Sequence, residues 1–179
     1  MKKSYIFLSD SFEEIEAIAV IDILRRAEVP IVTVSMNETL EVAGSHHVTI
    51  LADTLFDKSA ITDADYLILP GGSTRLNDYD ELKSLIVEHS SHGGNLAAIC
   101  AAPMVLGGLG LLAGKRATCY PGFENYLKGA TLVKAPVVID GTTITGNGPA
   151  AALAFSYALV EQICGKDKAD TLRSQMQYI

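Results

Sequence analysis

One stretch of the chain, "NLAAICAAPMVLGGLGLL" at residues 95–112, places Cys100 between a short apolar run and a series of small residues. Small residues flank a nucleophile where a strand turns sharply into a helix, because bulky side chains do not fit there. The positive end of the helix that follows favours a thiolate. A buried, inert thiol is the alternative, since free cysteine is often a core residue. The flanking alanines favour the reactive thiol.

Glu16 is the second residue whose position indicates chemistry. The pattern predicts a helix that is capped by Asp10 or Ser11 and runs to about Ala27. Glu16 falls in the middle of its apolar stripe, which consists of Phe12, Ala19, Val20, Ile23 and Ala27. A carboxyl among apolar groups tends to keep its proton, and it could then donate a hydrogen bond to a nearby thiolate. The alternative is a partly buried carboxylate that the helix N-terminus stabilises.

The elements that must position these residues alternate between short apolar runs and longer helical segments. Strands are expected at 4–9, 30–36, 65–70, 95–100, 116–120 and 135–146. Helices are expected at 10–27, 78–94, after Cys100, at about 149–164 and from about 167. This alternation predicts one α/β domain over residues 1–179 of the flavodoxin-like open-sandwich kind. The sheet is mostly parallel with helices on both faces, and a small hairpin is added at 39–51.

Ligands bind beyond the carboxyl ends of the strands in such a sheet. The backbone N–H groups of Gly71 and Gly72 are expected there, where they could bind an oxyanion beside Cys100. A plain turn is the alternative for a lone pair of glycines. Other residues expected to line the pocket are Tyr120, Asn147, Pro149 and His46.

Composition narrows the class of protein. The chain has 179 residues, of which 49% are hydrophobic, and a formal net charge of −7. Without a basic run, nucleic acid is not an expected partner, and no segment is long enough to span a membrane. The odd count of three cysteines and the absence of a paired CxxC spacing argue against a disulfide framework or a zinc site. We therefore expect no metal, no cofactor and a cytoplasmic location.

Four motifs together resemble the DJ-1/PfpI (ThiJ-like) family over nearly the whole chain. They read "SDSFEEIEAIAVIDILRRA", "YLILPGG", "AAICAAP" and "GNGPAAALAFSYALVE". The resemblance implies a flavodoxin-like fold, a homodimer and a reactive cysteine paired with a protonated glutamate. By position these two are Cys100 and Glu16, with the backbone amides of Gly72 and Ala101 beside the thiol.

The chain also departs from the family's pattern. Protease-like members carry histidine where Ala101 follows the cysteine, and relatives of the glyoxalase and deglycase kind often carry one where Tyr120 stands. An arginine of some relatives corresponds to His46. We therefore expect a thiol protein that acts weakly on small reactive carbonyl compounds. The alternative is a non-catalytic oxidative-stress sensor or chaperone that works through oxidation of Cys100. A cysteine peptidase or amidase is the least favoured of the three.

Overall fold

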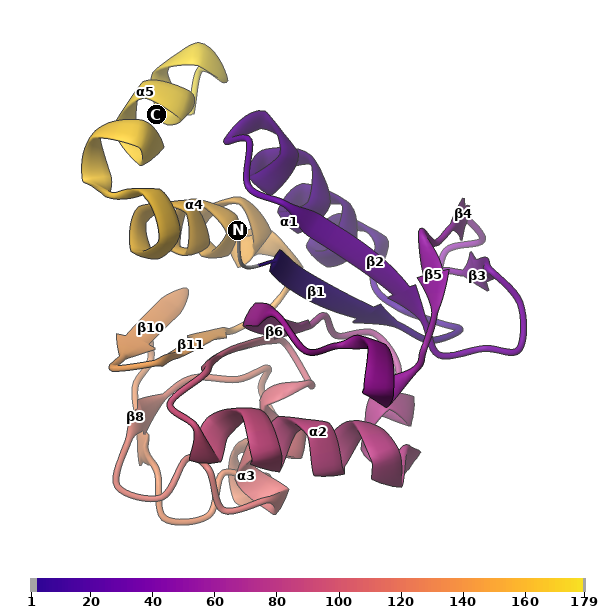
Figure 1. Ribbon diagram of the computed structural model, residues 1–179. Helices are drawn as coiled ribbons and strands as arrows, with labels where there is room; N and C mark the ends of the chain where they lie inside the picture. The colour runs from indigo at the N-terminus through magenta and orange to yellow at the C-terminus, as the bar shows by residue number, and fades with distance from the viewer. Residues whose placement is uncertain (1–2, 179) are drawn as a thin grey trace.

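The computed structural model describes residues 3–178, which form a seven-stranded central sheet (Figure 1). The strands follow the order β10-β11-β7-β6-β1-β2-β5, and all neighbours are parallel except β10 and β11. Their bounds are β1 Lys3–Leu8, β2 Ile31–Ser35, β5 Thr54–Leu55, β6 Ala64–Leu69, β7 Asn95–Ile99, β10 Val137–Asp140 and β11 Thr143–Gly146. The predicted mostly parallel sheet is confirmed.

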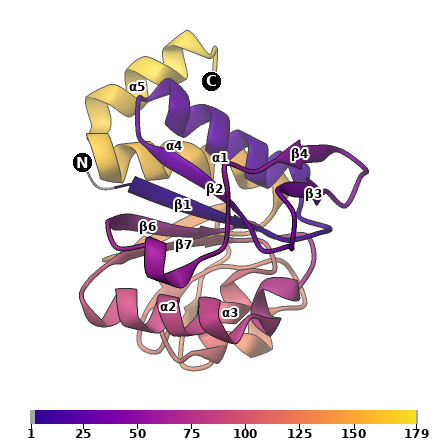
Figure 2. The ribbon, with the colours of Figure 1, turned by 45° about the vertical axis from the view of Figure 1, so that its right-hand side comes forward.

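Helices cover both faces of this sheet (Figures 1 and 2). On one face lie α1 Glu14–Arg26, α4 Ala152–Cys164 and α5 Lys166–Gln175. On the other face lie α2 Asp80–Ser91 and α3 Pro103–Gly108. Short 3-10 helices complete the elements: η1 Lys58–Ala60, η2 Arg75–Asp78, η3 Glu124–Tyr126 and η4 Pro149–Ala151. None of the helices in the described part of the chain is long and apolar enough to cross a membrane.

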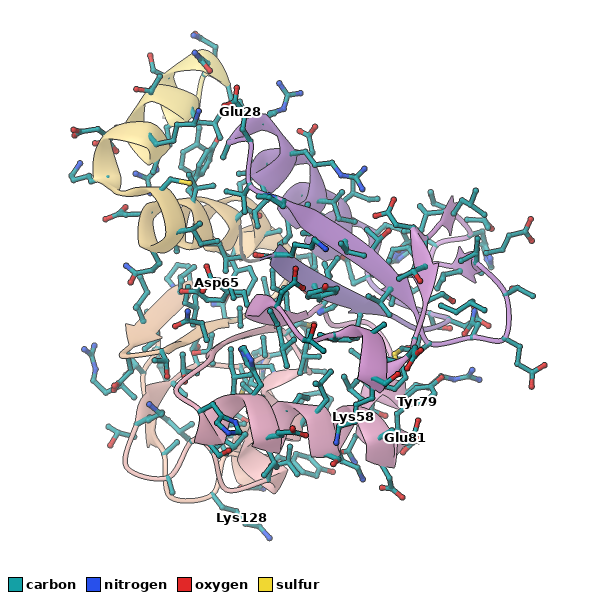
Figure 3. The ribbon with its side chains drawn as sticks, viewed as in Figure 1. Glu28, Lys58, Asp65, Tyr79, Glu81 and Lys128 are labelled. Atoms are coloured by element: carbon teal, nitrogen blue, oxygen red, sulfur yellow. The ribbon has the colours of Figure 1, made fainter. Side chains whose placement is uncertain are left out.

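The apolar runs become strands because both of their faces are buried. In β1, Ile6 and Leu8 join the core on the α1 and α4 side, whereas Tyr5 and Phe7 join the core on the α2 and α3 side. Alternate side chains of a strand point to opposite faces, so a doubly covered strand is apolar at most positions; Ser4 is a buried polar exception in β1. Exposed charged residues such as Glu28, Glu81 and Lys128 lie on the outside (Figure 3).

The first helix begins later than the sequence indicates. The predicted caps Asp10 and Ser11 were wrong, because α1 starts at Glu14 and the side chain of Glu13 accepts a hydrogen bond from the Glu16 N–H at 2.8 Å. The turn that precedes α1 has a different conformation and is hydrogen-bonded to the hairpin. Ser11 has a φ of 67°, and its N–H donates to the carbonyl oxygen of Ala43. Helical geometry is therefore impossible there, and a buried carboxylate takes over the capping.

Two smaller sheets lie beside the central one. The expected hairpin is present as β3 Glu41–Ala43 and β4 Thr49–Leu51, which pair antiparallel. The strand expected at 116–120 shrinks to β8 Arg116–Ala117 and pairs only with β9 Thr131–Leu132, outside the central sheet. Thr118 leaves the strand because its N–H donates to the Thr145 hydroxyl rather than to a backbone carbonyl.

Candidate active site at Cys100 and Glu16

Cys100 stands on a strained turn directly after β7. Its φ is 65°, in the left-handed region that side-chain-bearing residues rarely adopt. Two backbone hydrogen bonds fix the turn: its N–H donates to Gly146 O at 2.9 Å, and its carbonyl accepts from the Tyr120 N–H at 2.8 Å. Ala101 and Ala102 are buried on its far side. The small residues that the sequence places after the cysteine are therefore required by space.

Glu16 lies in the first turn of α1 with its side chain completely buried. Its Oε2 accepts a hydrogen bond from the Gly71 N–H at 2.7 Å, and the carboxyl also hydrogen-bonds to the Cys100 thiol. Its Oε1 has no well-aligned partner among residues 3–178. Burial raises the pKa of Glu16 to about 7, against the opposing effect of both hydrogen bonds. A proton on Oε1 is the chemical answer to a buried oxygen without a donor.

The pKa of the Cys100 thiol is also changed by burial and by its contact with Glu16. Burial, then the charge and hydrogen bond of Glu16, raise the pKa of Cys100 to about 12, while the Ala101 and Gly72 backbone N–H groups lower it. This is opposite to the low thiol pKa that the sequence suggests, because α3 is only six residues long and the sulfur is buried beside a carboxyl. The hydrogen bond between them lowers the pKa of Glu16 and raises that of Cys100, so the pair releases the proton of Glu16 well before that of the thiol.

Two glycines at the end of β6 allow this close approach. A Cβ added to Gly71 would lie 2.5 Å from the Cβ of Cys100 and 2.6 Å from Oε2 of Glu16. Gly72 has a φ of 101°, and a Cβ there would lie 2.3 Å from the carbonyl oxygen of Ser11. Both positions therefore need glycine. The Gly71 N–H is bonded to Glu16 and is not available for an oxyanion, so the expected role stays with the Gly72 N–H, which lies beside the thiol.

The remaining predicted residues lie at the ends of neighbouring strands or in the loops that follow them. The backbone N–H of Tyr120 donates a hydrogen bond to the carbonyl oxygen of Cys100, and the exposed ring of Tyr120 lies over Gly148. Asn147 follows β11 directly, and its N–H donates to Pro136 O; Pro149 then opens η4. These residues surround the carboxyl edge of the sheet. A cavity of about 1100 Å³ lies elsewhere, between η1 and α2, and none of the predicted site residues lines it.

His46 has a different role from the one expected. It lies in the turn between β3 and β4, where its Nδ1 is 2.9 Å from Oε2 of Glu14. Burial would raise the pKa of Glu14, but hydrogen bonds from His46 and Ser45 outweigh it and lower the pKa to about 2. The pKa of His46 is raised by its hydrogen bond to Glu14 and by the charge of that carboxylate. The pair thus ties the hairpin to α1, and no imidazole is among the groups that act on Cys100.

Glu14 is a residue that the sequence analysis did not single out. Ligand atoms of Glu13, Glu14 and His46 lie within 4.8 Å of one another, close enough in principle for a metal ion. Glu14 already accepts hydrogen bonds from the Ser45 hydroxyl and from both the backbone and ring nitrogens of His46. Because these bonds occupy the carboxylate, we assign the cluster a structural role.

A flavodoxin-like sheet with a cysteine on a left-handed turn beside a buried glutamate defines the class of this protein. Residues 2–162 match the family model described as "DJ-1/PfpI family". The chain belongs to this family.

Relatives with known names support the assignment. Protein dj-1beta of Drosophila melanogaster is 34% identical over 177 residues, which cover 93% of this chain and 92% of that protein. The crystal structure of Drosophila melanogaster DJ-1beta matches with a TM-score of 0.93 over 100% of both chains. Protein DJ-1 homolog B of Arabidopsis thaliana is 39% identical over 94% of this chain, which spans only 40% of that longer protein. A deglycase from Pyrococcus horikoshii is 32% identical over 67% of this chain.

Proposed function

We propose that the chain is a thiol enzyme that converts small α-oxoaldehydes such as methylglyoxal into hydroxy acids, with Cys100 as nucleophile and Glu16 as proton carrier. The observation that carries this proposal is the completely buried Glu16 carboxyl hydrogen-bonded to the thiol. A structural carboxyl would normally be paired with a cation or exposed. A perturbed acid next to a nucleophile is typical of an active site. The similarity to a protein named a deglycase supports carbonyl chemistry.

The chemistry balances without a cofactor. Because the pKa of Glu16 is about 7 and that of Cys100 is about 12, Glu16 is the carboxylate of the pair and Cys100 the thiol above neutral pH. Glu16 takes the thiol proton as general base while the sulfur attacks, and the Gly72 and Ala101 amides stabilise the charge that develops there. The sulfur adds to the aldehyde carbon and forms a hemithioacetal. Glu16 then moves a proton from that carbon to its neighbour, so the aldehyde carbon is oxidised and the ketone carbon is reduced. Water cleaves the resulting thioester, which releases the hydroxy acid and restores the thiol.

We expect this activity to be weak. The place where related enzymes often carry histidine is Tyr120, whose ring is exposed over Gly148. The hairpin histidine, His46, is bound to Glu14. Without an imidazole, water must attack the thioester with only Glu16 as a base.

Turnover of methylglyoxal to lactate by the purified protein tests the proposal. Cys100→Ala should abolish product formation, and Glu16→Gln should lower it by at least about tenfold, since general acid–base groups typically contribute factors of about 100 to 10,000. Cys164→Ala is the matched control, because that thiol is exposed in α4. The proposed activity would be disproved if the wild-type protein formed no lactate. It would also be disproved if Cys100→Ala protein still formed it.

A homodimer and a cytoplasmic location belong to the same proposal. Large apolar side chains are exposed on α1, where Ile15 is 59% and Ile18 is 41% accessible, and on the hairpin, where Leu51 is 70% accessible. Adjoining exposed apolar groups are typical of a subunit interface. Sedimentation of wild-type protein and Ile15→Glu should give a dimer and a monomer, respectively. The three free thiols fit a reducing compartment.

The second candidate, an oxidation sensor, is favoured by the same buried acid. A protonated Glu16 can donate to a sulfinate oxygen on Cys100 and so stop oxidation at that stage. Oxidation by peroxide should then yield sulfinate on Cys100 in the wild type and a mixture that includes sulfonate in Glu16→Gln. If the wild-type protein forms no lactate but shows this difference, the sensor is the better account.

A further inference from the structure

A second feature near Cys100 is a cavity of about 550 Å³ between the segment that follows β8 and the segment that joins β9 to β10. Sites for small molecules are typically clefts of about 300–1000 Å³ with mostly apolar walls and a few polar groups. Apolar walls are present here. The lining residues are Ala117, Thr118, Cys119, Pro121, Glu124, Leu132, Val133, Lys134, Ala135, Pro136 and Asn147.

Polar side chains in this lining lack partners. Thr118 is only 5% exposed and Cys119 only 8%, yet neither the hydroxyl nor the thiol hydrogen-bonds to any group of residues 3–178. The side-chain amide of Asn147 likewise has no partner within that part of the chain. The Thr118 hydroxyl is not sealed off and Asn147 is half-buried, so these polar groups are open to the cavity rather than enclosed in the core. A bound molecule with a hydrogen-bonding end would satisfy them.

The polar end of the cavity adjoins the candidate active site. Cys119 precedes Tyr120, whose N–H bonds to the carbonyl of Cys100, and Asn147 follows Gly146, which accepts from the Cys100 N–H. Cys119 and Asn147 are thus each one residue away from a residue whose backbone hydrogen-bonds to that of Cys100. One strand spacing at right angles to one residue step gives about 6 Å from Cα to Cα. Cys119 packs on the α2 and α3 side and Cys100 on the other, so a shared ligand crosses the end of β7.

We propose that this cavity binds the apolar substituent of the carbonyl substrate, so that the chain prefers uncharged α-oxoaldehydes with an aryl or branched alkyl group over methylglyoxal. The inference rests on the proposed function of Cys100. The carbonyl end would lie toward Asn147, and the hydrocarbon would lie against Leu132, Val133 and Pro136. Glu124 and Lys134 contribute opposite charges to the lining, so no net charge selects an ionic ligand.

Two measurements test this proposal separately from the enzyme. In Cys100→Ala protein, the unreactive ketone acetophenone should shift the amide resonances of residues 117–119 and 131–135, and Ala135→Phe, which fills the cavity, should remove those shifts. In the otherwise wild-type protein, Ala135→Phe should lower kcat/KM for phenylglyoxal by at least about tenfold and leave that for methylglyoxal unchanged. Ala60→Phe, at an exposed position in η1, is the matched control.

The outcomes are distinguishable. If both aldehydes are turned over but acetophenone causes no shifts, the cavity proposal is overturned and the proposed enzyme stands. The same holds if Ala135→Phe lowers kcat/KM equally for the two aldehydes. Acetophenone shifts without turnover of either aldehyde would overturn the proposed function and with it the role of the cavity as a substrate site. Selective loss of phenylglyoxal turnover together with loss of the shifts supports both.

Discussion

At alkaline pH, the Glu16→Gln variant should be more stable than the protein that carries the glutamate. The pKa of Glu16 rises from 4.5 to about 7 on folding, and one pKa unit corresponds to about 1.4 kcal/mol. Between these values the folded state binds more protons than the unfolded state, so the free energy of unfolding falls as pH rises. The full loss above pH 7 is about 3 kcal/mol by this arithmetic. Glutamine carries no charge at any pH, so the Glu16→Gln variant does not lose this stability.

The assay is urea denaturation at about pH 5 and about pH 8 in a Cys100→Ser background, which removes the coupled thiol. The gain of Glu16→Gln over its parent should be larger at the higher pH by about 3 kcal/mol. Glu81→Gln, at an exposed position of α2, reports the effect of the substitution itself at the surface. An equal effect of Glu16→Gln at both pH values would show that burial does not hold a proton on this carboxyl.

Three further predictions concern the neighbouring residues. Gly71→Ala should destabilise the protein by about 1–3 kcal/mol in urea because its Cβ meets Cys100 and Glu16; Gly108→Ala, which meets nothing within 4 Å, is the control, and an unchanged midpoint for Gly71→Ala would refute the packing. His46→Ala should lower the melting temperature more in acid than in alkali, because a histidine whose pKa is raised on folding stabilises below its unfolded pKa and loses that effect as pH rises. His47→Ala is its control, and a pH-independent decrease would contradict the ion pair. Casein should not be cleaved in a Cys100-dependent way, since no imidazole acts on the thiol; cleavage that Cys100→Ser abolishes would reveal an overlooked base.

Much of this architecture could be predicted from local pattern. Strands β1 and β7 are buried on both faces and therefore read as unbroken apolar runs. Glu16 could be found because helical periodicity places it among apolar residues whatever the tertiary contacts are. The need for small residues around Cys100 follows from the crowding of one turn. These are properties of short segments.

Other features depend on contacts between distant segments. The bond from Glu14 to His46 joins positions 32 residues apart, and nothing in either segment indicates it. The late start of α1 follows from the backbone bond between Ser11 and Ala43. The raised pKa of Cys100 comes first from burial and then from the charge of Glu16, and both depend on how the fold packs distant segments around the thiol. A rule based on the following helix alone therefore gives the wrong direction.

The most direct test of the account is the ultraviolet thiolate absorbance of Cys100 against pH, with Cys119 and Cys164 replaced by serine. Because burial and the charge of Glu16 hold Cys100 protonated, the wild-type protein should show little thiolate at about pH 8, and Glu16→Gln should form thiolate at a lower pH than the wild type because it lacks that charge. The opposite result would be abundant thiolate in the wild type at that pH and its appearance only at higher pH in Glu16→Gln. That result would mean that Glu16 keeps the proton and Cys100 carries the charge, and it would contradict the role of Glu16 as the base that activates the thiol.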